Sequence, residues 1–299
     1  MPFHRERGAA PRKRARGQAS GVAEAKPEAG KRPGAEPKPG ATRDLLAVDV
    51  GNSETVVGWF QGEALSSHWR LTSGRQSADE IGLTLDLLLE RAGAGTAPRE
   101  AGPAAVLCSV APSLTRAWAE ALERRSGRPP VEVSAATVRD LPIRYHDPSA
   151  VGADRIANAV AARALYGTPA IVVDLGTATT FDCISLQGEY LGGVIAPGVM
   201  TSAEELFRRA ARLPRVELRK PERALGRTTE ESLQAGVLWG TAGQVDALVR
   251  RLAIEIRGTP HVIATGGLAR FIAPECETVN VVDETLTLKG LRLVWEKAR

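Results

Sequence analysis

Two short segments of the chain each place an aspartate and a glycine in a polar turn directly after a run of apolar residues. The first runs from Asp49 to Val56 and reads DVGNSETV, and the second begins at Asp174 and reads DLGTATT. Glycine and small hydroxyl residues let backbone N–H groups approach an anion closely, as in phosphate-binding turns. An aspartate at the mouth of such a turn can hold a cation, or a metal-bound water, against the phosphates of a nucleotide. Two such turns facing one cleft predict a nucleotide site.

The two turns belong to a longer internal repeat. LAVDVGNSETVVGWFQGEAL aligns with IVVDLGTATTFDCISLQGEYL, and the shared Gln-Gly-Glu coincides after a slip of one residue, the size of a β-bulge. The pairs that this alignment matches are Asp49 with Asp174, Gly51 with Gly176, and Thr55 with Thr180. The spacing of the copies is far too long for a solenoid. We interpret the repeat as two similar α/β lobes that arose by duplication; the alternative is a coincidence between two hairpins.

A carboxylate and a guanidinium stand together in RYHDPSAVGADR, at residues 144–155. Asp154 and Arg155 fall in the first turn of an apolar helix, directly behind Gly152. One interpretation is helix capping, because the helix dipole favours an acid at this position. The other is catalytic: the Asp154 carboxylate could accept the proton of a substrate hydroxyl while Arg155 pairs with a substrate anion.

A third glycine element, VIATGGLARF at residues 262–271, runs from a strand through Gly266 and Gly267 into a helix. Such a backbone could pack flat against a nucleoside, or it could be a plain strand-to-helix turn. The chain has no Gly-x-x-x-x-Gly-Lys-Ser/Thr motif, no Gly-x-Gly-x-x-Gly motif after a strand, and no lysine between residues 44 and 219. A P-loop mechanism is therefore excluded. Phosphate charge must be met by backbone N–H groups, arginine, hydroxyls or a bound cation.

The apolar pattern predicts the strands and helices that position these groups. Strands fit DLLAVDVG, TVVGWF, ALSSHWRL, AAVLCSV and AIVVDLG, at residues 44–51, 55–60, 64–71, 104–110 and 170–176. Helices fit residues 77–93, with Ser77 as the N-cap, residues 112–127, and residues 152–167. This order of elements predicts an α/β fold that begins with three antiparallel strands.

Composition indicates a soluble globular protein. The 299 residues suffice for two ordinary domains, and 43% hydrophobic with 25% charged residues is a normal balance. No apolar stretch reaches the ~20 residues needed to cross a bilayer, and no secretory signal is recognisable. Three widely spaced cysteines fit reduced thiols better than disulfides or a metal site. We therefore expect a cytoplasmic protein without a membrane partner.

The first 43 residues differ from the rest of the chain. They hold 11 Lys/Arg and 4 Glu, a balance of +7, whereas the remaining 256 residues hold 28 basic and 31 acidic residues, a balance of −3. They also contain six prolines, six glycines and no aromatic residue except Phe3. We expect residues 1–43 to be disordered and to bind nucleic acid weakly at most. The segment is either a solvated extension or the sequence after an upstream start codon that is not used. The two lobes are then predicted at residues 44–168 and 169–299.

Taken together, these motifs resemble the type III pantothenate kinases. The resemblance covers about Leu45 to Trp295 and rests on DVGNS, GADRIANA, DLGTATTFD, YLGGVIAPG, LGRTTEES and IATGGLA in the family's order and spacing. It implies the α/β fold of the acetate kinase, sugar kinase, Hsp70 and actin superfamily: two similar ribonuclease-H-like (actin-like ATPase) lobes with a nucleotide cleft between them. It also implies a homodimer that uses ATP to phosphorylate pantothenate to 4′-phosphopantothenate, the first step of coenzyme A biosynthesis.

The resemblance implies roles for individual residues. The ATP site is expected to consist of the first turn and one residue of the second, namely Asp49, Val50, Gly51, Asn52, Ser53, Glu54, Thr55, Val56 and Thr177. Asp49 would position ATP with its Mg²⁺, and Asp174 matches the ligand of a monovalent cation, K⁺ or NH₄⁺. Asp154 would be the general base. The pantothenate site is expected to consist of Tyr145, Gly152, Ala153, Asp154, Arg155 and Thr229.

Two features depart from the family pattern. The first turn usually carries a threonine where this chain has Ser53, which keeps the hydroxyl, and residues 1–43 have no counterpart. Two other functions stay open: a regulatory protein, since some members have been described as accessory factors for transcription, and a superfamily relative that phosphorylates a sugar or an acyl acid. The intact acids Asp49, Asp154 and Asp174 argue against the first. GADR followed by IANA argues against the second.

Overall fold

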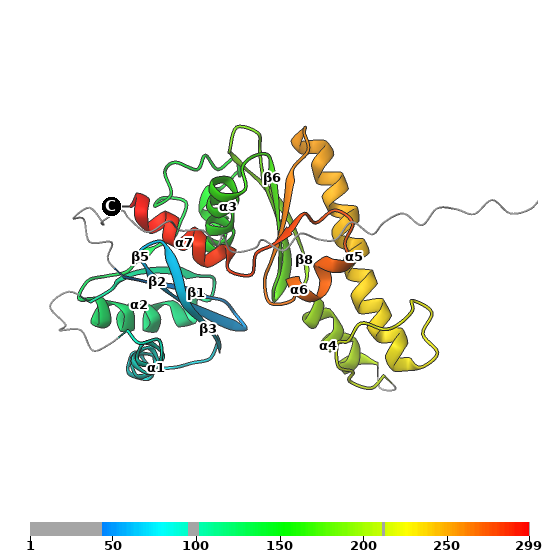
Figure 1. Cartoon of the computed structure of the whole chain (residues 1–299), viewed down its shortest axis with the longest axis horizontal. Helices are drawn as coiled ribbons and strands as arrows, with labels where there is room; N and C mark the ends of the chain where they lie inside the picture. The colour runs from blue at the N-terminus through cyan, green and yellow to red at the C-terminus, as the bar shows by residue number, and fades with distance from the viewer. Residues whose placement is uncertain (1–43, 95–101, 211–212, 299) are drawn as a thin grey trace, which may run out of the picture.

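The computed structural model describes residues 44–94, 102–210 and 213–298, so the expectations for residues 1–43 lie outside the described part of the chain. The described residues form two five-stranded sheets with helices on both faces (Figure 1). In the first sheet the strand order is β3-β2-β1-β4-β5. Its strands are β1 (Leu45–Val50), β2 (Glu54–Gln61), β3 (Ala64–Thr72), β4 (Ala104–Ser109) and β5 (Val131–Glu132).

The second sheet repeats the first strand for strand. Its order from the matching edge is β8-β7-β6-β9-β10. In both sheets the first three strands of the lobe pair antiparallel, and the last two continue the sheet in parallel. The predicted duplicated α/β fold is confirmed. The strands are β6 (Ala170–Leu175), β7 (Ala178–Ile184), β8 (Tyr190–Pro197), β9 (His261–Thr265) and β10 (Val281–Val282).

The pairing register corrects the sequence alignment of the two lobes by one residue. Thr55 lies opposite Val50 in the first sheet, whereas Thr179 lies opposite Leu175 in the second. The counterpart of Thr55 is therefore Thr179, and the predicted match with Thr180 is wrong. The physical reason is the turn length: residues 51–53 connect the first two strands, but only residues 176–177 connect their counterparts.

Helices cover the outer faces of the two sheets, and a shared core lies between the sheets. α1 and α2 pack beneath the first sheet, with Ser77 and Glu80 forming the predicted capping box, and α5 and α6 pack on the outer face of the second sheet. α3 joins a core cluster to which both sheets contribute. No helix in the described ranges combines the length and the apolar character needed to cross a membrane. The helices are α1 (Ala78–Arg91), α2 (Pro112–Ser126), α3 (Ala153–Leu165), α4 (Val199–Arg209), α5 (Thr229–Ile256), α6 (Ala269–Ile272) and α7 (Leu286–Lys297).

The C-terminal helix α7 crosses from the second lobe back to the first. It packs against α3 and against β1, β2 and β4, as its position next to β1 in Figure 1 also shows. Leu288 and Leu291 of α7 share one buried cluster with Leu45 and Ala47 of β1. A division of the chain at residue 168 stays a prediction, and the structure adds that α7, although it follows the second lobe in sequence, completes the core of the first.

The close approach of α7 to α3 depends on Gly290. A Cβ atom at this position would lie 2.1 Å from the carbonyl oxygen of Ala157. The two helices must therefore move apart in a Gly290→Ala variant, and we expect a loss of about 1–3 kcal/mol in the free energy of unfolding, as overpacking typically causes. Gly82→Ala in α1 is the matched control, since nothing lies within 4 Å of its added methyl group. That change should stabilise the protein by about 1 kcal/mol or less. Urea unfolding that gave both variants the same sign would contradict this account.

Candidate active site between the two sheets

The alternation of side chains along β1 turns the first predicted acid toward α3. Leu46 and Val48 pack into the core beneath α1 and α2, whereas Leu45 and Ala47 pack into the core shared with α3 and α7. Successive side chains of a strand point to opposite faces of its sheet. Asp49 therefore points toward α3.

The same alternation operates on β6. Ile171 and Val173 pack into the core beneath α5, while Ala170 and Val172 pack into the core shared with α3. Asp174 consequently also faces α3, from the other sheet. The duplicated fold thus directs two carboxylates toward one helix, and that helix carries Asp154 in its first turn.

Asp49 has a buried oxygen atom without a partner. Its Oδ1 makes no hydrogen bond within the described residues. Burial and then the charge of Asp154 raise the pKa of Asp49 to about 7, with a smaller contribution from Asp174, while the Cys108 thiol and Arg70 act in the opposite direction. A buried, unpaired carboxylate oxygen is costly, and a cation beside it would remove both the missing contact and the repulsion.

Asp154 both caps α3 and stands near the other acids. Its Oδ1 accepts a hydrogen bond from the backbone N–H of Arg155 at 2.7 Å. A Cβ atom on Gly152 would lie 2.5 Å from that oxygen, so glycine is needed for the carboxylate to turn back over the helix end. Burial raises the pKa of Asp154, against the lowering effect of the Arg155 N–H and guanidinium. Capping and proton acceptance are compatible, since one oxygen of the carboxylate serves the cap.

Asp174 is held from one side and crowded by glycine on the other. Asn158 Nδ2 donates to its Oδ2 at 3.1 Å. Its Oδ1 lies beside Gly266, where φ is +92° and a Cβ atom would come within 2.5 Å of that oxygen. Burial and the charge of Asp154 raise the pKa of Asp174 to about 6, against the Asn158 hydrogen bond. The third glycine element is therefore packed against the second acid, a position that only glycine can fill.

The two predicted phosphate turns meet at the junction of the lobes. Thr177 Oγ1 donates to Ser53 Oγ at 3.0 Å, so residues 124 positions apart are in direct contact. Asn52, Ser53 and Glu54 are exposed, whereas Thr55 is buried and its hydroxyl lies 2.9 Å from Ser73 Oγ. The structure thus brings together the tips of both turns, and Thr55 supports the first turn from below.

Arg155 is engaged inside the protein. Its Nε donates to Asp182 Oδ1 at 2.7 Å and its Nη2 to the carbonyl of Phe181 at 3.3 Å. The hydroxyl of Tyr190 donates to the same Asp182 oxygen at 2.9 Å. Burial raises the pKa of Asp182 to about 7, while the Arg155 charge and the Tyr190 hydroxyl lower it. The guanidinium that sequence reasoning assigned to a substrate anion thus already has an internal carboxylate partner.

Tyr145 lies at the outer end of this network. Its ring covers Gly192 of β8, where a Cβ atom would lie 3.3 Å from a ring carbon, and the side chain is 40% exposed. Tyr145 is also close enough to influence the hydroxyl of Tyr190 electrostatically. An aromatic face is therefore available to a ligand beside the start of α3.

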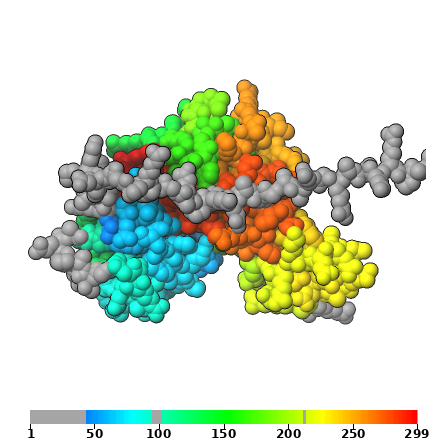
Figure 2. All heavy atoms as spheres, in the orientation of Figure 1, coloured from blue at the N-terminus to red at the C-terminus, as the bar shows by residue number. Residues whose placement is uncertain are grey.

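Thr229 does not reach the acids within one chain. It is the first residue of α5, exposed, next to the N-cap Thr228, which accepts a hydrogen bond from the backbone N–H of Glu231. This end of α5, yellow in Figure 1, lies beside α4 and well away from α3. The surface is indented between the first lobe, blue to cyan, and the yellow end of the second (Figure 2).

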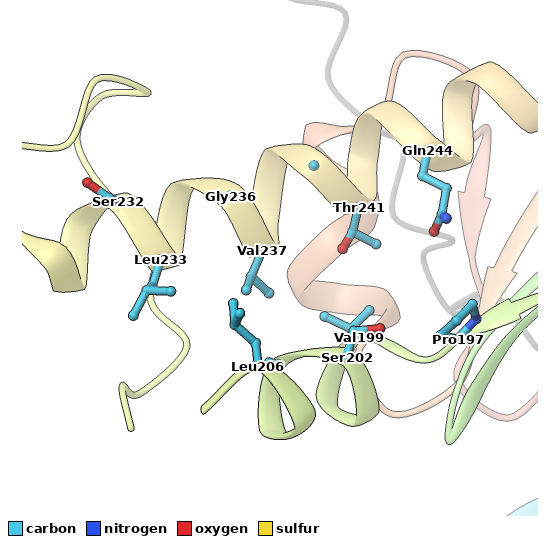
Figure 3. A pocket seen from close by; sticks show the side chains of 12 residues that line it. Pro197, Val199, Ser202, Leu206, Ser232, Leu233, Gly236, Val237, Thr241 and Gln244 are labelled. Carbon is cyan, nitrogen blue, oxygen red and sulfur yellow. The ribbon is translucent and has the colours of Figure 1, made fainter. Parts of the chain in front are cut away.

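A second hollow, of about 490 Å³, lies between α4 and α5 and does not involve the acids. Its apolar side chains point toward one another from the two helices (Figure 3). They include Val199 and Leu206 of α4 and Leu233 and Val237 of α5, and Leu206 is 44% exposed. This groove has the character of a contact surface rather than of a phosphate site.

The acid cluster fits cations that arrive with a ligand. Within the described ranges, no group of three His, Cys, Asp or Glu side chains is arranged to hold a metal ion by itself. Mg²⁺ is usually bound by one or two carboxylates together with the phosphates of a substrate. The unpaired oxygen of Asp49 fits one such contact, and at Asp174 the hydrogen bond from Asn158 engages Oδ2 and not Oδ1.

Sequence reasoning missed Asn158 and Asp182 as parts of the site. Both lie inside segments that had been singled out, GADRIANA and DLGTATTFD, and both are polar residues flanked in sequence by apolar ones. They are almost fully buried, Asn158 at 1% exposure and Asp182 at 0%. A buried polar residue normally has a partner, which was the signal available.

Comparison with known proteins matches most of the chain to one protein family. Residues 45–251 match the family "Type III pantothenate kinase". A type III pantothenate kinase from Moorella thermoacetica is 48% identical over 254 residues, which cover 85% of this chain and 99% of the relative. One from Streptomyces avermitilis is 46% identical over 265 residues, covering 85% and 98%.

Solved structures agree on the fold. A Campylobacter jejuni protein described as a putative Baf family transcriptional activator superposes with a TM-score of 0.52 at 20% identity, covering 85% of this chain and 98% of its own. The activator of a 2-hydroxyisocaproyl-CoA dehydratase from Clostridium difficile, with bound ADPNP, gives 0.52 at 14% identity, covering 85% and 95%. At these identities the likeness concerns the two-lobed architecture alone.

Proposed function

The chain belongs to the type III pantothenate kinase family, and we propose that its acid cluster is where the γ-phosphoryl group of ATP passes to pantothenate. The protein is an ATP-dependent phosphotransferase that makes 4′-phosphopantothenate, in the first step of coenzyme A biosynthesis. The observation that carries the site assignment is the convergence of Asp49, Asp154 and Asp174, with one buried Asp49 oxygen left unpaired. Phosphoryl transfer demands alignment and charge neutralisation above all, and this arrangement offers both.

Asp154 acts as the general base. Its carboxylate takes the proton of the primary hydroxyl of pantothenate while the hydroxyl oxygen bonds to the γ-phosphorus and the bond from that phosphorus to the ADP oxygen breaks. The raised pKa of Asp154 supports this role, because a base is most effective when its pKa approaches the working pH. Gly152 and the helix end fix the direction in which the carboxylate points.

The turn from Asp49 to Val56, together with Thr177, holds the phosphates of ATP. Exposed Asn52 and Ser53 offer polar groups at the tip, opposite the second turn. Asp49 would hold the Mg²⁺ that accompanies ATP, and Asp174 would hold K⁺ or NH₄⁺. These cations would supply positive charge that neutralises the phosphates. The chain has no lysine between residues 44 and 219 that could supply it instead.

Pantothenate binds beside the start of α3. Tyr145 supplies an exposed aromatic wall, and the half-buried Gly152 and Ala153 stand next to the base. Arg155 offers its guanidinium as a donor to the substrate. Asp182 holds this group by a hydrogen bond, so the position of the guanidinium is set before the substrate arrives. A preset donor costs less to order on binding than a free one.

Thr229 enters the pantothenate site from a second copy of the chain in a homodimer. Two observations support this: the start of α5, which holds Thr229, lies away from α3 of the same chain (Figure 1), and Leu206 is exposed in the adjacent groove between α4 and α5 (Figure 3). A second copy would cover that surface. The pantothenate site of the second copy would in turn receive Thr229 of the first copy.

This arrangement predicts complementation between two inactive proteins. Asp154→Asn and Thr229→Ala are each expected to have low turnover as pure homodimers. A mixed dimer would contain one site with both changes and one with neither. After subunits exchange at equal concentrations, about one quarter of the wild-type turnover should return. If mixing yields only the average of the two separate turnovers, Thr229 does not act in the partner's site.

A coupled assay tests the proposed function directly. We expect release of ADP that requires both ATP and pantothenate, with formation of 4′-phosphopantothenate, and a rate that rises when Na⁺ is replaced by K⁺ or NH₄⁺. ADP release without pantothenate, or transfer to a sugar instead, would point to another superfamily activity. The three buried free cysteines support a cytoplasmic location, where thiols stay reduced.

A further inference from the structure

One buried amide lies beneath the acid cluster and has no part in the transfer described above. Asn158 stands one helical turn after Asp154 on α3, and only 1% of it is exposed. Its Nδ2 donates to Asp174 Oδ2 at 3.1 Å. Its Oδ1 accepts a hydrogen bond from Thr287 Oγ1 at 2.8 Å. The amide therefore connects the second lobe, through α3, to the C-terminal helix.

We propose that Asn158 is a positioning residue that selects which oxygen of Asp174 faces a monovalent cation, and that Thr287 holds Asn158 in the required orientation. The inference rests on the proposed cation role of Asp174. The amide donor holds Oδ2, which leaves Oδ1 on the side of Gly266 and Gly176. Gly266 packs close to Oδ1, but no hydrogen bond within the described residues engages this oxygen, so it is the one left to contact an ion.

The orientation of the amide follows from its two partners. An ionised carboxylate only accepts hydrogen bonds, so it must face the NH₂ group of Asn158. The amide oxygen then points to α7 and needs a donor, because a buried acceptor without one is costly. The hydroxyl of Thr287 is that donor. Removing it should loosen Asn158, and through it Asp174, although Thr287 touches neither cation nor substrate.

Cation binding can be measured without turnover. A cation that binds only the folded protein stabilises it by RT ln(1 + [K⁺]/Kd), so the dependence of the melting temperature on K⁺ concentration gives the dissociation constant. The whole protein, free of nucleotide, would be titrated with KCl at constant ionic strength set by NaCl, and the half-saturating K⁺ concentration (the K⁺ midpoint) would be fitted to the melting temperatures. Turnover with pantothenate at saturating K⁺ would be measured beside it.

Asn158→Leu should raise the half-saturating K⁺ concentration by about 10- to 100-fold, which is typical when a group that orients a metal ligand is lost. Thr287→Val should move it in the same direction by a smaller factor and keep its turnover at saturating K⁺. Thr287→Ser retains the hydroxyl and should match the wild type. The control is Tyr166→Phe, which removes a 2.9 Å hydrogen bond to Asp283 next to α7 but no contact of Asn158. It should lower the melting temperature and leave the K⁺ midpoint unchanged.

The possible outcomes distinguish the positioning role of Asn158 from the cation role of Asp174 on which it rests. If the wild type responds to K⁺ and the midpoint of Thr287→Val or of a folded Asn158→Leu stays in place, the positioning role is wrong while the cation site stands. If Thr287→Ser and Thr287→Val behave alike, the hydroxyl is not the orienting group. A wild type with no response to K⁺ would overturn both the cation role of Asp174 and this inference, but leave the kinase assay unaffected.

Discussion

Replacing Asp154 by asparagine should lower turnover with pantothenate by about 10²- to 10⁴-fold, the usual effect of removing a general base. The amide keeps the size of the carboxylate and can still cap the helix through its oxygen, so the fold should persist. The melting temperature should not fall, because the change removes a buried acid whose charged form burial disfavours. A large kinetic loss without a loss of stability is the expected signature.

The pH dependence of Asp154→Asn adds a second readout. The charge of Asp154 is among the causes that raise the pKa of Asp49 and of Asp174. Its removal should lower both pKa values, so the acidic limb of the residual activity should move to lower pH. In the wild type that limb belongs to the coupled group rather than to one residue.

Asp147→Asn is the matched control for this variant. Asp147 lies on the same segment, is exposed, and caps the short helical turn that follows it, which asparagine can do equally well. Turnover of the control should equal that of the wild type. Turnover of Asp154→Asn within threefold of the wild type would show that Asp154 is a helix cap only.

Replacing Asp49 by asparagine should have the second large effect, on ATP. Without this carboxylate we expect kcat/KM for Mg²⁺–ATP to fall by about 100-fold or more, because one charged contact to the metal nucleotide is lost. The pantothenate KM should change much less, since Asp49 stands on the nucleotide side. Initial rates with each substrate varied in turn would separate the two.

The same variant should be more stable than the wild type above neutral pH. The pKa of Asp49 rises from 3.8 to about 7 on folding, so between these values the folded state holds a proton that the unfolded state has released. The wild type therefore loses stability as pH increases from about 4 to about 7. Asparagine does not ionise and lacks this loss. Urea unfolding at pH 5 and pH 8 should show a gain that is larger at pH 8.

Asp79→Asn provides the control for Asp49→Asn. The Asp79 side chain is 82% exposed on α1 in the same lobe, and its pairing with Arg124 is at the surface. Neither the ATP kinetics nor the pH dependence of unfolding should change by much, since such pairs contribute little. If Asp49→Asn gained the same stability at both pH values, burial would not destabilise the ionised carboxylate of Asp49.

Local pattern was sufficient to predict β1 to β4, β6 and β9, the first three helices and the repeat. Alternation along β1 and β6 and the capping box at Ser77 are decided by residues adjacent in sequence. The acids were also recognisable, because Asp49 and Asp174 interrupt otherwise apolar strands. These features need no knowledge of what packs against what.

Contacts between distant segments could not be predicted in this way. The partner of Arg155 is Asp182, 27 residues later, and it faces α3 only because β7 carries Phe181 and Cys183 on the other side. The register of the second lobe depends on a turn one residue shorter, which shifted the match of Thr55 from Thr180 to Thr179. Long-range packing settled each of these points.

The crossing of α7 has a consequence during synthesis. Residues 45–109 leave the ribosome early, but the core around Leu45 and Ala47 is closed by Leu288 and Leu291 near the end of the chain. At a translation rate of about 5–20 residues per second, the delay before α7 appears is roughly 10 to 35 s. During that time the nascent first lobe carries an uncovered apolar face. A truncated message or a stalled ribosome would therefore release a chain whose earliest-made half is the part prone to aggregate.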